Sequence, residues 1–194
     1  GLANRLGQAT SASADKLLAA IPLARFRRPA SAVHDPSWRP SGCGALNLFS
    51  GEAEWSAELL ANGAPWVLDY ELCDPDFPCD LDTPQMRSEV EKLISCSSVA
   101  VVGAGPVCSS FSVAVTPAVR SSKFPWGLPH ISANMQSKVE VGNSSCLWMS
   151  RVFRLCVKKR TAIWVENPDC SWLFRTPPWL DILQLPGVDT LRVD

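Results

Sequence analysis

Histidine and paired cysteines are scarce in this 194-residue sequence, and their scarcity excludes one class of site. The two histidines are His34 and His130, and none of the eight cysteines stands in a Cys-x-x-Cys pair or beside a histidine. Zinc sites need such clusters. We therefore expect no metal, and we expect reduced thiols in an intracellular protein, with nucleus and cytoplasm both open.

Long apolar runs are also lacking. No stretch near 18 apolar residues occurs, which argues against a membrane-spanning helix and a membrane partner. The sequence shows no basic start followed by an apolar segment, the pattern of a signal peptide. Charged residues make up only 19%, with 16 prolines and 8 tryptophans, a composition that excludes a coiled coil and a wholly disordered chain. With 46% hydrophobic residues, the chain can bury the core of one globular domain.

Neither sign of charge dominates, because the formal total is −1, yet the charges are unevenly spread. Residues 1–40 hold six basic and two acidic groups, residues 41–103 two basic and eleven acidic, and residues 104–194 ten basic and six acidic. The acidic middle favours a cationic small ligand, and the basic flanks favour phosphates. Solvated faces on a neutral domain give the same pattern, and that alternative stays open.

The hydrophobic pattern predicts strands that alternate with helices. Residues 1–40, rich in Ala, Ser, Pro and Arg, are expected to form a basic linker or tail with one short helix over 15–21, and residues 41–194 the folded core. The expected strands cover 45–49, 66–70, 98–103, 161–165 and 188–193, and the expected helices cover 52–62, a segment from Thr83-Pro84 onward and about 133–160. This alternation predicts an α/β fold with a doubly wound, mostly parallel sheet.

Three polar segments follow predicted strands, where parallel sheets bind ligands. They are Phe49-Ser50-Gly51, Gly105–Cys108 and Glu166-Asn167-Pro168. The thiol of Cys108 becomes a nucleophile if nearby N–H groups lower its pKa, although a buried, inert cysteine is the plainer interpretation. Glu166 ends an apolar strand, so we expect desolvation to raise its pKa and suit it to general acid work. A surface carboxylate is the plainer interpretation there.

Five motifs, spread over residues 45–174, resemble those of DNA cytosine-5 methyltransferases in both order and spacing. Asn47–Gly51 is similar to the family's cofactor loop, Asp69-Tyr70-Glu71 to its ribose-binding acidic motif, and Asp80-Leu81 to the motif whose acid meets the adenine amine. Gly105–Ser112 resembles the Pro-Cys-x-x-Phe-Ser nucleophile loop, and Val165–Pro168 resembles the Glu-Asn motif that grips the target base.

The resemblance implies a Rossmann-like methyltransferase fold whose C-terminal part is missing, and methyl transfer from S-adenosylmethionine to C5 of cytosine in DNA. It implies that Cys108 adds to C6 of a flipped cytosine and that Glu166 binds its N3 and amine. Arg120 is the candidate for an arginine that the family supplies from its later part. The implied cofactor residues are Phe49, Ser50, Gly51, Glu71, Asp80 and Leu81, and the implied substrate residues are Pro106, Ser109, Asn167 and Pro168.

Several positions depart from the family's motifs. Asn47 replaces the usual aspartate, Ala53 and Glu54 stand where glycines are expected, Val107 replaces a proline, and Pro168 stands where an aliphatic residue is commoner. The departures in the cofactor loop favour an alternative, namely a catalytically degenerate module of a larger polyprotein that binds nucleic acid or protein without turnover. RNA in place of DNA also stays open, and further domains of a longer chain are expected partners.

Weaker candidates lie outside these motifs. His130 could pair with Cys108 as in a hydrolase, although sequence distance cannot show such a pair. Trp126 is the tryptophan best placed to stack on a base. The run Lys158-Lys159-Arg160 could contact phosphate, but a role at the end of its helix is simpler.

Overall fold

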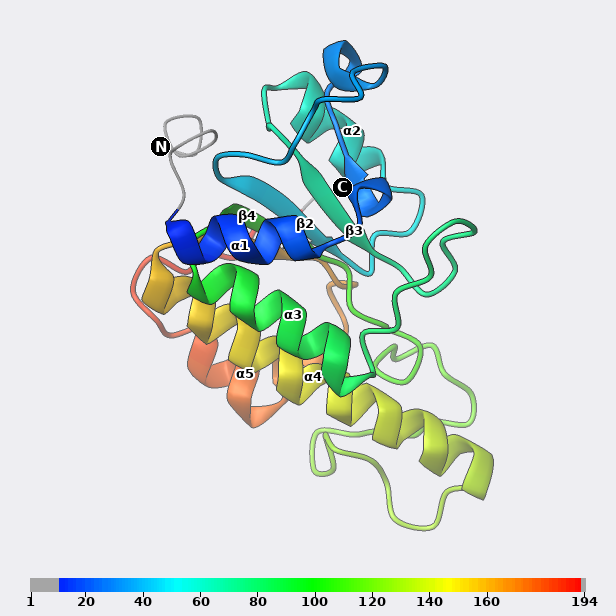
Figure 1. The fold of residues 1–194 in the computed structure, drawn as a ribbon. Helices are drawn as coiled ribbons and strands as arrows, with labels where there is room; N and C mark the ends of the chain where they lie inside the picture. Colours follow the sequence, from blue (N-terminus) through cyan, green and yellow to red (C-terminus); the bar gives the residue numbers. More distant parts are fainter. Residues whose placement is uncertain (1–10, 193–194) are drawn as a thin grey trace. The chain divides into compact units, whose positions relative to one another are not determined.

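The computed structural model describes residues 11–192, which divide into two compact units. Unit 1 takes its described residues from the segment that ends at Gly105 and from Leu155–Val165. Unit 2 comprises Pro106–Arg154 and the described residues from Glu166 onward. Figure 1 follows the elements along the chain.

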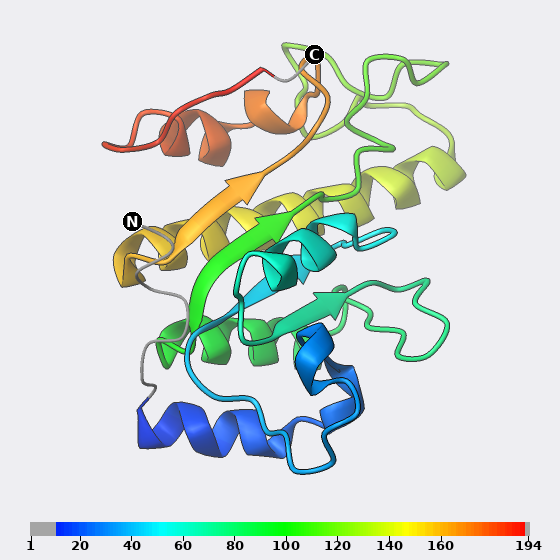
Figure 2. The ribbon, with the colours of Figure 1, turned by 90° about the horizontal axis from the view of Figure 1, so that it is seen from above.

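Unit 1 is built on a sheet whose described strands have the order β1-β3-β2-β4-β5. The strands are β1 (Phe26–Arg27), β2 (Gly44–Leu48), β3 (Val67–Tyr70), β4 (Val99–Ala104) and β5 (Ala162–Val165). β1 pairs antiparallel with β3, and the other pairs are parallel. The four parallel strands therefore end at one edge of the sheet (Figure 2). The prediction of an α/β fold with a mostly parallel sheet is confirmed.

The central strands form where the sequence is almost wholly apolar, with Asn47 of β2 as the polar exception. All residues of β2 and all residues of β4 are buried, as expected for parallel strands covered on both faces. β5 is different: its residues alternate between exposed and half-buried because it lies at the edge of the sheet. The four strands predicted over 45–49, 66–70, 98–103 and 161–165 are confirmed, with each boundary within one residue.

Helices cover both faces of this sheet (Figure 1). α2 (Glu54–Ala61) packs Leu59 against Ala45 and Val67 on one face. α3 (Pro84–Ser95) lies on the other face and begins as predicted, because the Thr83 hydroxyl accepts a hydrogen bond from the Met86 amide at 3.4 Å. The two predicted helices are confirmed.

The prediction of a tail over residues 1–40 needs correction for its described part, while residues 1–10 lie outside the described residues. α1 (Ala12–Ala20) buries Ala14 and Leu18, and β1 adds Phe26, which is 4% exposed and packs on the Trp66 ring at 5.6 Å. Two short 3-10 helices, η2 (Leu23–Arg25) and η3 (Ala30–Ala32), complete the segment. A few well-spaced apolar side chains attach this segment to the core, although its average composition is that of a linker.

Unit 2 consists of a long loop and helices. The loop runs from Pro106 to α4 (Ala133–Lys159), which confirms the helix predicted over about 133–160. α4 belongs to unit 2 up to Arg154. η4 (Leu173–Arg175) and α5 (Pro177–Ile182) follow, with the Trp179 ring 5.7 Å from that of Phe153. None of the helices within residues 11–192 has the length and apolar composition needed to cross a membrane.

The fifth strand predicted over 188–193 does not form over its described residues, 188–192. Gly187 has a left-handed backbone (φ 79°), and Leu191 is 85% exposed. A strand needs a partner for its backbone and a surface for its alternate side chains, and a segment this exposed has no such surface. The prediction was therefore wrong.

A methyl group at Gly44 is expected to lower the free energy of unfolding by about 2–3 kcal/mol. A Cβ at this position would lie 2.1 Å from Cδ2 of Trp66, which is fully buried and packed edge-on against Phe26. Urea unfolding of Gly44→Ala measures the loss. In a Trp66→Leu background the same substitution should cost much less, because the clash is gone; an equal cost in both backgrounds would contradict this account.

Candidate functional site

The loop after β2 has an unusual backbone. Phe49, Gly51 and Ala53 have φ values of 57°, 52° and 59°, a left-handed conformation that glycine adopts freely and that costs other residues about 1–2 kcal/mol each. The Phe49 amide donates to the Tyr70 carbonyl at 2.8 Å, and the Ala53 amide to the Ser50 carbonyl at 2.9 Å. Apart from its two chain neighbours, no described residue has a heavy atom within 4 Å of the place where a Gly51 Cβ would project. A strained, open loop at a strand end is typical of a ligand site.

Glu71, just after β3, connects this loop to the next one. One of its carboxylate oxygens accepts the Gly51 amide at 3.0 Å, and the other accepts the Cys73 amide at 3.1 Å. A carboxylate has about four lone-pair sites, so the half-buried Glu71 can accept further hydrogen bonds. Glu71 and Gly51, both predicted as cofactor residues, thus lie together in unit 1.

The two other predicted cofactor residues in unit 1, Asp80 and Leu81, already have partners within the protein. Asp80 accepts the Asp82 amide at 2.8 Å through its carboxylate. Leu81 is only 4% exposed, and its carbonyl accepts the Arg87 guanidinium at 2.6 Å. Leu81 therefore packs inside the unit, whereas Asp80 is half-buried at its surface.

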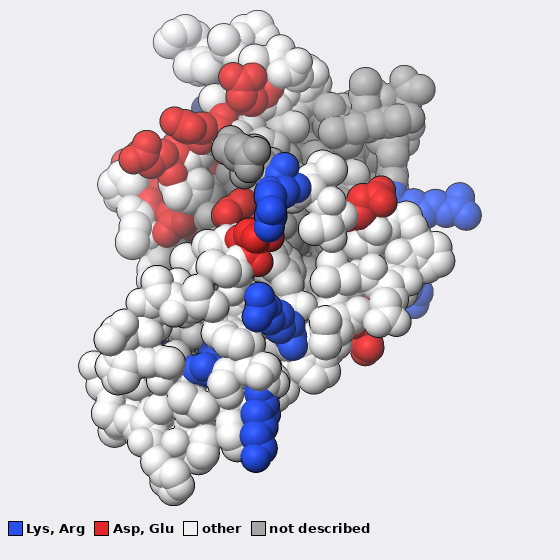
Figure 3. Space-filling model, turned by 180° about the vertical axis from the view of Figure 1, so that it is seen from behind, with Lys and Arg blue, Asp and Glu red and all other residues white. Residues whose placement is uncertain are grey.

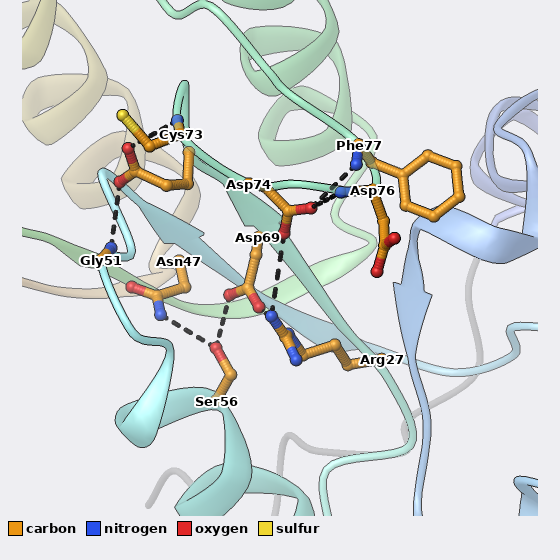
Figure 4. A network of polar contacts seen from close by, with 10 residues as sticks. Arg27, Asn47, Gly51, Ser56, Asp69, Cys73, Asp74, Asp76 and Phe77 are labelled. Carbon is orange, nitrogen blue, oxygen red and sulfur yellow. Dashed lines mark hydrogen bonds and ion pairs between the residues drawn. The ribbon is translucent and has the colours of Figure 1, made fainter.

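Sequence reasoning missed a polar chain that runs beside this loop (Figure 4). The Asn47 amide donates to the Ser56 hydroxyl at 2.9 Å, and that hydroxyl donates to Asp69 at 2.5 Å. Arg27 completes the chain with an ion pair to Asp69. The Asp69 side chain is only 6% exposed and is bonded to two side chains, whereas the half-buried Glu71 carboxylate accepts only backbone amides and is the more accessible of the two acids in the Asp69-Tyr70-Glu71 motif. Arg27 lies in the predicted tail, and no local pattern in the sequence indicates its partner.

Tyr70 points to the opposite face of the sheet, as alternation along a strand requires. Its buried hydroxyl donates to Glu89 of α3 at 2.6 Å, and Glu89 also accepts Arg25 at 2.8 Å. Burial, together with the negative Glu89, raises the pKa of Tyr70 well above its usual value. The phenol therefore stays neutral and serves as a buried donor between the sheet and α3.

A small pocket of about 120 Å³ opens beside the polar chain in unit 1. Its lining residues are Ala24, Arg25, Arg27, Asp69, Asp74, Asp76 and Phe77. Asp74 accepts the amides of Asp76 and Phe77 at 2.9 and 2.8 Å. The hydrogen bond from Phe77 is the main cause that lowers the pKa of Asp74, and the bond from Asp76 adds to it, although partial burial acts in the opposite direction. The carboxylate of Asp74 thus shapes its own loop.

Cys108 is exposed in unit 2, so the interpretation of it as a buried, inert cysteine is wrong. Its carbonyl accepts the amides of Phe111 and Ser112, both at 2.8 Å, which closes a tight turn around Ser109 and Ser110. Of the predicted substrate residues here, Ser109 is exposed and Pro106 is buried. The turn therefore exposes the Cys108 thiol, while the backbone of Cys108 is held by the hydrogen bonds to its carbonyl.

The segment that begins at Glu166 is joined to the Cys108 turn at two points. The Asn167 side-chain amide donates to the Pro106 carbonyl at 2.9 Å. The Trp172 amide donates to the Phe111 carbonyl at 2.8 Å. One bond thus lies before Cys108 in the sequence and the other after it, and both belong to unit 2. The structure brings together the nucleophile loop and the Glu-Asn segment, which lie far apart in the sequence.

Glu166 itself is exposed, and the prediction of a desolvated carboxylate is wrong for this structure. The physical reason is that it follows β5, the edge strand, whose residues are themselves partly exposed. Pro168 is exposed as well, and its carbonyl accepts the Ser171 amide at 2.8 Å. Asn167 Oδ1 is buried without a partner among the described residues, a cost that a donor on a ligand would remove.

Arg120, predicted to contact substrate, is 3% exposed. Its Nε donates to the Ser110 carbonyl at 2.8 Å, and Nη1 donates to the Pro125 carbonyl at 2.6 Å and to Asn143 Oδ1 at 2.8 Å. Burial lowers the pKa of Arg120 to about 10. The guanidinium thus holds protein segments together inside unit 2.

The weaker candidates are placed as follows. His130 is exposed and has a left-handed backbone (φ 67°). Trp126 is half-buried, and its carbonyl accepts the Asn143 amide at 2.8 Å. Lys159 donates to the Ser95 carbonyl at 2.7 Å, which joins the ends of α4 and α3. Within residues 11–192, no three His, Cys, Asp or Glu side chains are grouped as a metal ion would require.

Alkylation of the native protein should separate the cysteines by exposure. Cys73, Cys108 and Cys170 are exposed, whereas Cys146 and Cys156 are buried. Burial raises the pKa of Cys156 to about 12, so the reactive thiolate is scarce at pH 8. We expect the three exposed thiols to react with iodoacetamide at least tenfold faster than Cys156 in peptide mass spectrometry. Rapid labelling of Cys156 in the folded protein would contradict the burial described for it.

Comparisons with protein-family models, with curated proteins and with solved structures find no match to this chain. The function of the chain is therefore inferred from the polar and reactive groups that each of the two units brings together.

Proposed function

We propose that this chain transfers a methyl group from S-adenosylmethionine to C5 of cytosine in DNA, with Cys108 as the nucleophile. The observation that supports it most directly is the pair of bonds at 2.9 and 2.8 Å that join the Cys108 turn to the Glu166 segment. Cys108 and Glu166 are both exposed. An accessible thiol and an accessible carboxylate on one bonded frame suit addition to a heterocyclic base.

The proposed chemistry assigns each group a task. The Cys108 thiolate adds to C6 of a flipped cytosine, so an S–C bond forms and the ring electrons move toward C5 and N3. Glu166 takes up a proton from solvent as the base binds, donates it to N3 and accepts from the exocyclic amine through its other oxygen, which neutralises the developing charge. After C5 has taken the methyl group, the C5 proton passes to water, the C5–C6 double bond re-forms, the C6–S bond breaks to release the Cys108 thiolate, and N3 returns its proton to Glu166. Asn167 fixes the segment on Pro106 and offers its buried Oδ1 to the base.

Unit 1 supplies the groups proposed for the cofactor. Glu71 can accept ribose hydroxyls with the lone pairs that Gly51 and Cys73 leave open. The space above Gly51 admits a ligand close to the backbone, next to Phe49 and Ser50. Asp80 is proposed for the adenine amine. When bound, S-adenosylmethionine supplies the methyl group from its sulfonium.

Charge in unit 1 agrees with a cationic ligand. Residues 41–103 hold eleven acidic and two basic groups, and acidic side chains gather in one area of the face drawn in Figure 3. A field of this sign attracts a sulfonium and repels phosphates. For this reason we propose that this acidic segment of unit 1 meets the cofactor, and that unit 2, whose described residues hold seven basic and five acidic groups, meets DNA.

One observation favours the alternative, a degenerate module that binds nucleic acid or protein without turnover. Ala53 has the left-handed backbone (φ 59°) that glycine adopts without strain, and the resembled motif has a glycine there. Strain in the loop lowers the affinity for any ligand that needs the loop in this conformation. Loss of cofactor affinity would leave the Cys108 turn and its bonds to the Glu166 segment intact but without methyl-transfer activity.

Cofactor binding is the first measurement. Calorimetry should detect S-adenosylmethionine binding to the wild-type chain, and Glu71→Ala should weaken it at least tenfold, because a charge-assisted bond contributes about 1.5–3 kcal/mol. Glu58→Ala is the matched control, since Glu58 is an exposed carboxylate on α2. Incubation with a duplex that contains 5-fluorocytosine should then trap a covalent adduct, because fluorine cannot leave as a proton does.

The two functions predict different outcomes. Binding that depends on Glu71, followed by an adduct on Cys108, supports the methyltransferase. Nucleic-acid binding with neither cofactor binding nor an adduct supports the degenerate module. A trapped adduct on RNA but not on DNA would change the substrate and leave the chemistry in place.

A further inference from the structure

Arg120 lies at the centre of unit 2 and uses every donor of its guanidinium. Besides the bonds to the Ser110 carbonyl, to Pro125 and to Asn143, Nη2 donates to the Ser110 hydroxyl at 3.0 Å and to the Val139 carbonyl at 3.3 Å. All of these acceptors are neutral. A guanidinium carries five N–H groups in a fixed plane, so its contacts join three stretches of the chain in one geometry.

One of these stretches is the Cys108 turn itself. Arg120 holds Ser110 by both its carbonyl and its hydroxyl, and its guanidinium lies 3.8 Å from the centre of the Phe111 ring. The Phe111 amide in turn donates to the Cys108 carbonyl, and the Phe111 carbonyl accepts Trp172. Arg120 thus holds Ser110 and Phe111, and Phe111 is one of the two residues that join this turn to the segment that begins at Glu166.

We propose that Arg120 is a positioning residue for the nucleophile: it holds Ser110 and Phe111 so that Cys108 and Glu166 keep a fixed separation. This inference rests on the proposed function. It gives Arg120 a role different from the substrate contact predicted from the sequence, because no N–H of its guanidinium is left for a base. The residue acts through the turn and touches no reacting atom.

Gly142 offers an independent way to disturb the same contacts. A Cβ at this position would lie 2.3 Å from the Ser110 hydroxyl and 3.2 Å from both Arg120 Nη2 and the Phe111 ring. Gly142→Ala therefore displaces the Ser110 hydroxyl from the guanidinium and crowds Arg120 and the Phe111 ring, while the Arg120 side chain itself is retained. If Arg120 acts through Ser110 and Phe111, the two substitutions should have the same consequences.

Hydrogen exchange tests whether Arg120 holds the turn. Arg120→Lys keeps the charge but loses the planar fork, and we expect the Phe111 and Ser112 amides to exchange at least tenfold faster in it and in Gly142→Ala. The centre of α4, around Met149, should be unchanged. Arg151→Lys is the matched control, since Arg151 is exposed on the same helix. Unchanged exchange at Phe111 in both test variants overturns the inference.

Kinetics test whether the turn positions the nucleophile. Single-turnover methyl transfer to DNA should fall at least tenfold in maximal rate in Arg120→Lys and Gly142→Ala, with the half-saturating S-adenosylmethionine concentration changed less than twofold. An equal maximal rate, or a loss confined to cofactor saturation, overturns positioning while the proposed function stands. A wild-type chain that transfers no methyl group overturns the proposed function and the catalytic part of this inference, and exchange then still decides whether Arg120 holds the turn.

Discussion

Replacing Cys108 by serine is expected to abolish methyl transfer, with a loss of about four orders of magnitude or more. A thiol near neutral pH is partly thiolate, whereas a serine hydroxyl is not, so the substitution removes the nucleophile with little change in size. Cys108 is exposed, and its turn is held by backbone bonds from Phe111 and Ser112, so the fold should survive. Tritium transfer from labelled S-adenosylmethionine to DNA measures the activity.

Cys170→Ser is the control for this experiment. Cys170 is also exposed and belongs to the same unit, and the proposed chemistry gives it no task, so this variant should retain wild-type activity. The adduct with 5-fluorocytosine should disappear in Cys108→Ser alone. Methyl transfer that persists in Cys108→Ser, or that disappears only in Cys170→Ser, would contradict the assignment of the nucleophile.

Replacing Arg120 by methionine is expected to lower the free energy of unfolding by about 3–5 kcal/mol. Methionine fills much of the same volume but donates no hydrogen bond. Five acceptors then lose their donor, namely the carbonyls of Ser110, Pro125 and Val139, the hydroxyl of Ser110 and the side chain of Asn143. Each unsatisfied buried acceptor costs about 1–3 kcal/mol, and relaxation of the loop recovers part of the sum.

Urea unfolding measures the loss, with Arg151→Met as the matched control. Arg151 is exposed, and substitutions at such positions stay within about 0.5 kcal/mol of the wild type. A similar small change in Arg120→Met would mean that the buried charge costs as much to desolvate as its five bonds return. That result would remove Arg120 as the anchor of the loop.

Local sequence patterns were sufficient for the regular elements of unit 1. β2 and β4 are short, mostly apolar runs, β4 lies between Ser98 and Gly105, and α3 begins with a threonine cap and a proline at its first turn. These signals act between neighbouring residues, so they can be read without the fold. β1, by contrast, has two residues and no pattern of its own; it exists because Phe26 packs on Trp66 and pairs with β3.

The candidate site shows the same division. Cys108, Glu166 and Glu71 were found from the sequence because each directly follows or lies near a predicted strand end, where parallel sheets bind ligands. The exposure of Glu166 was predicted incorrectly, since the sequence does not say that its strand lies at the sheet edge. The role of Arg120 depends on acceptors up to 23 residues away in the chain, and no local pattern announces them.

The sequence by itself therefore determined the type and order of β2, α2, β3, α3, β4 and β5 in unit 1 and the residues that follow these strands. Those properties depend on the spacing of apolar side chains and on caps and turns, which act over a few residues. The tertiary structure alone decided which polar groups meet: Asn167 with Pro106, Trp172 with Phe111, and Arg120 with Ser110. Such pairs form where packing brings groups that are distant in the sequence within hydrogen-bond distance and away from water. Which groups are buried together depends on the packing of the complete fold and not on neighbouring residues.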